Sequence, residues 1–204
     1  MILDYKVILW DFDGVILNSM SVRDQGFVEV LKEFPEEEVK LLLEFHRKNG
    51  GLSRYVKFRY FFEEIRKEAI TEEEVNQWAH KFSLIMKELL VDSDLLILDS
   101  LNFIKKYSSQ IPMHIVSGSD QDELRFLCKQ LEIAKYFKSI QGSPTPKKQL
   151  VQELLKTNGY NHLDCILIGD SYNDFEAADF NKIDFAGYNN IELKNIGAYI
   201  SKFN

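Results

Sequence analysis

The sequence has no long apolar run, few cysteines and fewer basic than acidic residues. Its 204 residues include 25 Lys and Arg against 32 Asp and Glu, a formal net charge of −7. No apolar run approaches the roughly 18 residues of a membrane helix, and no charged-then-apolar leader precedes the first predicted strand. We therefore expect a cytoplasmic protein with neither a nucleic acid polymer nor an anionic membrane as its partner.

The two cysteines and four histidines form no metal or redox motif. Cys128 lies in a helical apolar pattern and Cys165 in a predicted strand, so both are expected to be small buried residues. The histidines have no ligand-like spacing. We therefore assign the histidines no role.

Two aspartates follow an apolar run in the segment VILWDFDGV, residues 7–15. On a strand Asp11 and Asp13 would point to the same side, and Gly14 allows a sharp turn beyond them. Such a pair suits phosphoryl transfer, with Asp11 as nucleophile and Asp13 as acid and then base. Asp11 must then be ionised and Asp13 protonated, so we expect environments that push their pKa values apart. A strand followed by an ordinary Asp-Gly turn has the same pattern.

A second apolar strand pattern ends in carboxylates in LDCILIGDSYNDFEAA, residues 163–178. Asp170 can join Asp11 around a hard cation with oxygen ligands, and Mg²⁺ fits best because it bridges to phosphate. Asp174 is expected to support this metal site from four residues further on. The alternative is an Asp N-cap before a solvated helix.

Two other segments offer a hydroxyl and a cation. In MHIVSGSD, residues 113–120, Ser117 and Gly118 are placed to bind phosphate at the start of a helix, although an ordinary loop and N-cap also fit. In GSPTPKKQLVQELL, residues 142–155, a buried lysine would neutralise the nucleophile and the phosphate together. The spacing to the following apolar pair favours Lys147 over Lys148.

The remaining pattern predicts an α/β fold with a helical insertion. Residues 18–92 have helical periodicity throughout. After residue 93, helices near 99–108, 120–131, 147–157 and 172–180 alternate with strands near 113–116, 138–141, 165–168 and 184–186. This alternation predicts a doubly wound parallel sheet built from residues 1–17 and 93–204, with ligands at the carboxyl ends of the strands.

One segment of the helical insertion is a candidate for substrate selection. In HRKNGGLSRYVKFR, residues 46–59, Ser53 can cap a helix that begins at Arg54. The Arg54 guanidinium could hold a carboxylate or a second phosphate through two parallel hydrogen bonds. An exposed turn with scattered basic residues is the alternative.

With these motifs in order, the chain resembles the haloacid dehalogenase-like (HAD) phosphohydrolase superfamily, in its phosphoglycolate phosphatase-like branch. The resemblance implies that the helical insertion is a cap that closes over the site. It also favours a phosphate ester, because the dehalogenases of the superfamily lack an aspartate at the position of Asp13. The roles that it implies are nucleophile for Asp11, acid/base and main-chain metal ligand for Asp13, phosphate hydroxyl for Ser117, cation for Lys147, and metal site for Asp170 and Asp174.

We therefore expect a Mg²⁺-dependent phosphatase that hydrolyses a small phosphorylated metabolite through an aspartyl-phosphate. Two alternatives remain, a sugar phosphomutase of the same fold and a non-catalytic binding protein on this scaffold. The oligomeric state and the particular substrate are not predicted.

Overall fold

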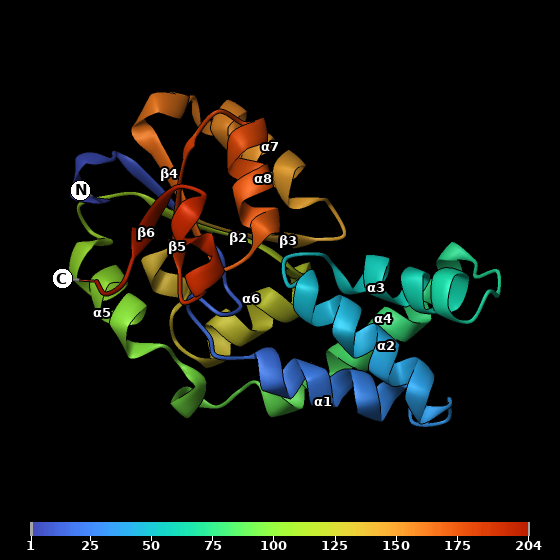
Figure 1. Ribbon diagram of the computed structural model, residues 1–204. Coiled ribbons are helices and arrows are strands. Elements are labelled where there is room, and N and C mark those ends of the chain that lie inside the picture. Colours follow the sequence, from blue (N-terminus) through green and yellow to red (C-terminus); the bar gives the residue numbers. More distant parts are fainter. Residues whose placement is uncertain (1, 204) are drawn as a thin grey trace.

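A computed structural model describes residues 2–203 and shows a six-stranded parallel sheet flanked by helices (Figure 1). The strand order is β3-β2-β1-β4-β5-β6, and all paired strands are parallel. This confirms the predicted α/β fold and adds a final strand, β6, at one edge of the sheet. The strands are β1 (Val7–Trp10), β2 (Met113–Asp120), β3 (Ser139–Ser143), β4 (Cys165–Gly169), β5 (Asp184–Tyr188) and β6 (Ala198–Ile200).

Strand β1 lies inside the sheet and is buried on both faces. Val7 and Leu9 pack into one apolar cluster with residues of α7 (Lys147–Asn158) and α8 (Tyr172–Phe180). Ile8 and Trp10 pack into the other, with residues of α5 (Leu98–Tyr107) and α6 (Gln121–Gln130). A strand covered on both faces is apolar at every position, which explains the uninterrupted VILW run.

The helices that follow the strands begin and end within one residue of the predicted ranges, but β2 is longer than predicted. It continues through Ser117 and Gly118 to Asp120, with an irregular register against β3 between Val116 and Asp120. Helix α6 begins only at Gln121, where the Asp120 carboxylate accepts a hydrogen bond from the Glu123 amide at 3.0 Å. The prediction that Ser117 lies at the start of this helix is therefore wrong, because Asp120 is the residue that caps it.

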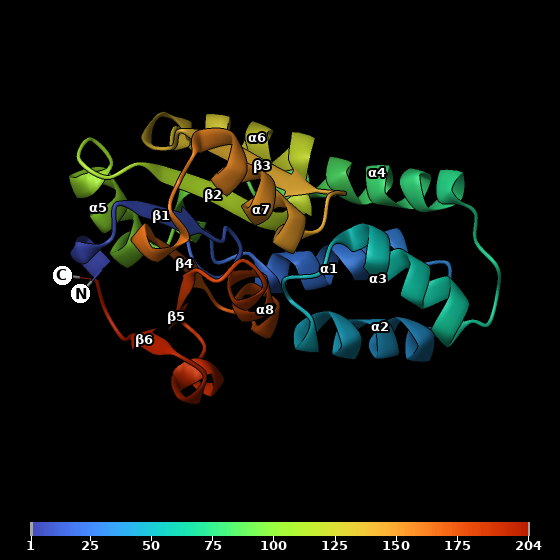
Figure 2. The ribbon, with the colours of Figure 1, turned by 90° about the horizontal axis from the view of Figure 1, so that it is seen from above.

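The helical insertion, residues 18–92, lies beyond the carboxyl ends of β2 and β3 (Figure 2). Its core is aromatic: Phe27, Phe58 and Phe82 are fully buried, and the rings of Phe27 and Phe82 lie 4.4 Å apart. The elements are α1 (Met20–Val30), α2 (Glu36–Lys48), α3 (Arg54–Tyr60), a π-helical turn (Phe61–Ile65) and α4 (Glu72–Leu89). Short 3-10 helices elsewhere are Ile2–Asp4, Ser93–Leu95, Ala134–Tyr136, His162–Asp164 and Ile191–Asn195. Between residues 2 and 203 no helix combines the length and apolarity needed to cross a membrane.

The chain turns sharply after β1, which ends at Trp10. Asp11 and Asp13 therefore lie in the turn and not on the strand, so strand alternation does not set the directions of their side chains. The Phe12 carbonyl accepts hydrogen bonds from the amides of Ile16 and Leu17 at 2.9 and 3.0 Å. Gly14 has a φ of 73°, and a Cβ added there would lie 1.9 Å from Asp170 Oδ2. The turn thus needs glycine both for its backbone and for the close approach of Asp170.

We expect Gly14→Ala to lower the free energy of unfolding more than Gly159→Ala. Gly159 also has a positive φ, 65°, but its added Cβ would meet nothing within 4 Å. The backbone cost common to both is about 1–2 kcal/mol, and the clash with Asp170 adds about 1–3 kcal/mol at Gly14 alone. Urea unfolding of the two variants measures the difference, and equal losses would contradict this account of the turn.

Candidate active site

Lys147 joins the end of β1 to the first turn of α8 through two carboxylates. Its ammonium lies 2.8 Å from Asp11 Oδ1 and also forms an ion pair with Asp174. The three residues are 7%, 3% and 0% exposed, so this contact is closed to water. Lys148, in contrast, is exposed and lies over the Phe180 ring. The structure therefore brings Lys147 into the site, as the spacing favoured.

Asp170 and Asp174 complete an acidic cluster with Asp11. Oxygens of the three carboxylates lie within 4.8 Å of one another. Asp174 Oδ2 accepts hydrogen bonds from the Ser171 amide at 3.0 Å and the Ser171 hydroxyl at 2.6 Å, and its other oxygen faces Lys147. The Asp174 oxygens are thus already engaged, which leaves Asp11 and Asp170 better placed to bind a metal directly.

The cluster carries more negative charge than Lys147 can balance. Burial and the charge of Asp174 raise the pKa of Asp11, and burial and the charge of Asp11 raise the pKa of Asp170 well above its usual range. Burial opposes the charge of Lys147, but the two adjacent carboxylates outweigh it and raise the pKa of the ammonium. A hard divalent cation with oxygen ligands would balance this excess, so the donor set fits Mg²⁺.

Asp13 has partners of its own. Its carboxylate accepts hydrogen bonds from Ser19 Oγ, from Ser119 Oγ at 2.5 Å and from Arg23 Nε at 2.7 Å. Burial alone would raise the pKa of Asp13, but the Arg23 charge and these hydrogen bonds lower it to about 2. The pKa values of Asp11 and Asp13 are therefore separated in the direction opposite to the predicted one. The charge that lowers the pKa of Asp13 is that of Arg23, which the sequence analysis did not identify.

The predicted phosphate-binding residues lie where β2 meets the helical insertion. Ser117 is 1% exposed, and its hydroxyl accepts a hydrogen bond from the Ser119 amide at 3.1 Å. A Cβ added to Gly118 would lie 2.3 Å from the carbonyl oxygen of Gly51. Gly118 thus allows the loop at residues 50–52 to lie directly on the end of β2.

Arg54 is buried in an ion-pair network. It therefore does not lie in an exposed turn, which was the alternative prediction for this segment. Its Nη1 and Nη2 lie 2.5 and 2.8 Å from the two carboxylate oxygens of Glu123, on α6. Glu123 is fully buried and also accepts a hydrogen bond from Arg23 Nη1 at 3.1 Å. The Arg54 guanidinium is thus already paired with Glu123. A direct role for Arg54 in substrate binding stays a prediction.

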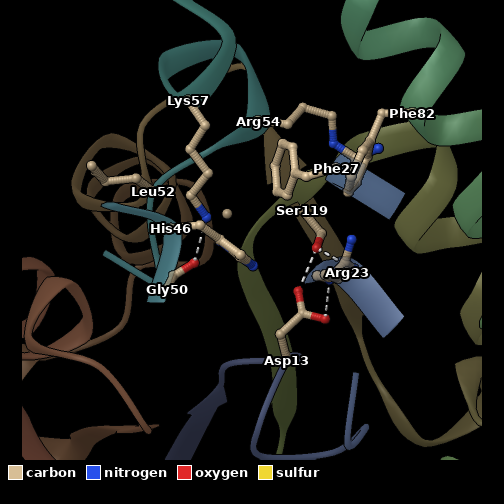
Figure 3. A pocket seen from close by; sticks show the side chains of 11 residues that line it. Asp13, Arg23, Phe27, His46, Gly50, Leu52, Arg54, Lys57, Phe82 and Ser119 are labelled. Carbon is tan, nitrogen blue, oxygen red and sulfur yellow. Dashed lines mark hydrogen bonds and ion pairs between the residues drawn. The ribbon is translucent and has the colours of Figure 1, made fainter. Parts of the chain in front are cut away.

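A small polar cavity lies between this network and the end of β2 (Figure 3). Its volume is about 20 Å³, room for roughly one water molecule. Asp13, Arg23, His46, Arg54 and Lys57 line it, with apolar walls from Phe27, Leu52 and Phe82. Sequence reasoning missed Arg23, Lys57 and Glu123. Ser19 and Arg23 are four residues apart and therefore lie on one face of a helix. This spacing is the one local signal that could have pointed to Arg23.

Comparisons with known proteins show the family and the fold of this chain. A family model described as haloacid dehalogenase-like hydrolase matches residues 8–188, so the chain belongs to that family. Similar solved structures include a predicted phosphatase from Clostridium acetobutylicum (18% identity, TM-score 0.77, covering 97% of this chain and 94% of that one). A second is a β-phosphoglucomutase from Clostridium difficile (17% identity, TM-score 0.76, covering 97% of this chain and 91% of that one). A third is the magnesium-bound HAD-hydrolase YfnB from Bacillus subtilis (17% identity, TM-score 0.72, covering 97% of this chain and 95% of that one). No curated protein matches the chain.

We expect Glu123→Gln to destabilise the protein strongly. The substitution keeps the side-chain shape but removes the buried charge that faces both Arg54 and Arg23, and breaking such a buried pair costs about 3–5 kcal/mol. Glu153→Gln, an exposed position on α7, is the control and should change the free energy of unfolding by less than about 0.5 kcal/mol. Equal small effects in urea unfolding would show that the network contributes little.

Proposed function

We propose that the protein is a Mg²⁺-dependent phosphatase that hydrolyses a small-molecule phosphate monoester through an aspartyl-phosphate on Asp11. The observation that carries this proposal is the buried contact of Asp11 with Lys147, 2.8 Å long, beside the carboxylates of Asp170 and Asp174. A carboxylate nucleophile attacking an anionic phosphate needs a fixed cation close by, and Lys147 supplies one.

In the first step a carboxylate oxygen of Asp11 forms a bond to phosphorus and the ester oxygen leaves. Lys147 neutralises charge on both reacting groups, while the Ser117 hydroxyl and the Gly118 amide donate to the phosphoryl oxygens. Mg²⁺, held by Asp11, Asp170 and the Asp13 main-chain carbonyl, would offset the negative charge of the phosphate.

Asp13 handles the proton in both steps. As acid it protonates the leaving alkoxide, and as base it takes a proton from the water that hydrolyses the aspartyl-phosphate and releases inorganic phosphate. Arg23 holds the carboxylate ionised in the present arrangement, which suits the second step. Before the first step Asp13 must gain a proton, and loosening its contact with Arg23 would permit that.

We further propose that residues 18–92 form a cap on a core of residues 1–17 and 93–204. The proposal is supported by the loop at 50–52, which covers the end of β2, and by Arg23 and Arg54, which reach from the insertion to Glu123 on α6. A closed cap would exclude bulk water during attack. It would also limit substrates to small molecules.

Phosphate release from a panel of small phosphate esters tests the proposed function. We expect release that depends on Mg²⁺ and falls to background with EDTA or with Asp11→Asn. Lys147→Met should lower kcat/KM by about 10²–10³-fold, the usual cost of losing one group that stabilises developing charge.

Lys148→Met is the matched control, because Lys148 is exposed next to Lys147, and it should leave kcat/KM within about twofold of the wild type. No release from any ester by a folded, Mg²⁺-loaded protein would contradict the proposal. So would Asp11→Asn with full activity.

A further inference from the structure

The loop after β5 holds both turns that carry the acidic cluster. Asn189 Nδ2 donates a hydrogen bond to the Gly14 carbonyl at 3.0 Å, in the turn that contains Asp11. Asn190 Nδ2 donates to the Asp170 carbonyl at 2.8 Å, directly after the end of β4. Two adjacent side chains of one loop thus bind the main chain of two turns that are far apart in the sequence.

These two hydrogen bonds link turns that are not otherwise bonded to each other. The Asp11 amide donates to the Ile168 carbonyl at 2.9 Å, which continues the pairing of β1 with β4. Beyond this point, within the described residues 2–203, no direct hydrogen bond joins residues 12–17 to residues 170–171. The two asparagine side chains therefore fix the position of one turn relative to the other.

The turns need such a link because the groups that they carry repel each other. Oxygens of the carboxylates of Asp11, Asp170 and Asp174 lie within 4.8 Å of one another, and Lys147 is the cation paired with this cluster. Like charges this close push their turns apart. On one side packing does not oppose that movement, because Asp170 borders a cavity of about 550 Å³ between the helical insertion and the core.

Each asparagine also has a local role, but neither local role requires the donated hydrogen bond. Asn189 has a φ of 56°, in the left-handed region that asparagine tolerates. Asn190 caps the 3-10 helix Ile191–Asn195, because its Oδ1 accepts a hydrogen bond from the Glu192 amide at 3.1 Å. Glycine would satisfy the first role and serine the second. The two Nδ2 donors are therefore additional to what the loop itself needs.

We propose that Asn189 and Asn190 are positioning residues that set the separation of the two metal-binding turns, and thereby the preference of the site for Mg²⁺ over Ca²⁺. Mg²⁺ needs near-octahedral geometry with bonds of about 2.0–2.1 Å, whereas Ca²⁺ accepts flexible geometry with bonds of about 2.3–2.6 Å. Turns held close together favour the smaller ion, and turns free to move apart suit the larger one. This inference rests on the proposed function for the presence of a cation at the site.

The test replaces each asparagine by a residue that keeps its local role, in the variants Asn189→Gly and Asn190→Ser. Calorimetric titrations measure the Kd of Mg²⁺ and the Kd of Ca²⁺. We expect each variant to bind Mg²⁺ about tenfold more weakly than the wild type, the usual effect of losing a hydrogen-bond partner behind a metal ligand. The Kd of Ca²⁺ should change less, so the preference for Mg²⁺ should fall.

Two control variants make the same replacements away from the site. Lys182→Gly also places glycine at a positive φ, here 55°. Asn161→Ser replaces an asparagine whose Oδ1 caps the 3-10 helix His162–Asp164, accepting from the Leu163 amide at 3.1 Å. Both controls should bind the two ions as the wild type does.

The outcomes separate this inference from the proposed function. Unchanged Kd values for both ions in the two asparagine variants would overturn the inference and leave the phosphatase standing. Equal weakening of Mg²⁺ and Ca²⁺, with a lower free energy of unfolding in urea, would show a merely structural role and also overturn it. Selective loss of Mg²⁺ binding, in a protein that releases phosphate from no ester, would support the positioning role and contradict the phosphatase.

Discussion

The ammonium of Lys147 lies between the carboxylates of Asp11 and Asp174, in a part of the molecule closed to water. These groups come from the end of β1 and from the first turns of α7 and α8. One ion-pair cluster therefore holds the end of this strand against the starts of both helices. Removing Lys147 would leave several buried carboxylates without a cation, a costly arrangement. In the proposed reaction the same cluster would supply the fixed positive charge that attack on a phosphate requires.

A second ion-pair network connects the helical insertion with the core. Arg23 on α1 and Arg54 on α3 both bind Glu123 on α6, and Arg23 also holds Asp13. Any movement of the insertion away from the sheet must separate these buried charges or let water reach them. The state of Asp13 is therefore coupled to the position of the insertion, because Arg23 belongs to α1 and Asp13 to the turn after β1.

The sequence predicted those parts of the site that follow from local pattern. Asp11, Ser117, Lys147 and Asp170 each stand directly after an apolar strand or at a helix start, and parallel strands bring such positions to one edge. The partners of Asp13 could not be predicted in this way. Arg23 and Glu123 are 100 residues apart in the chain and Arg54 and Glu123 are 69 apart, so no local pattern connects them. The extension of β2 through Ser117 was missed because its polar residues resemble a loop.

The most direct test of this account is a calorimetric titration of the protein with Mg²⁺, compared with Asp170→Asn. The excess negative charge around Lys147 predicts a single Mg²⁺ site in the wild type, weakened by more than about tenfold when Asp170 loses its charge. Asp122→Asn, an exposed position on α6, should bind as the wild type does. Absence of Mg²⁺ binding in the wild type, or unchanged binding in Asp170→Asn, would contradict the account.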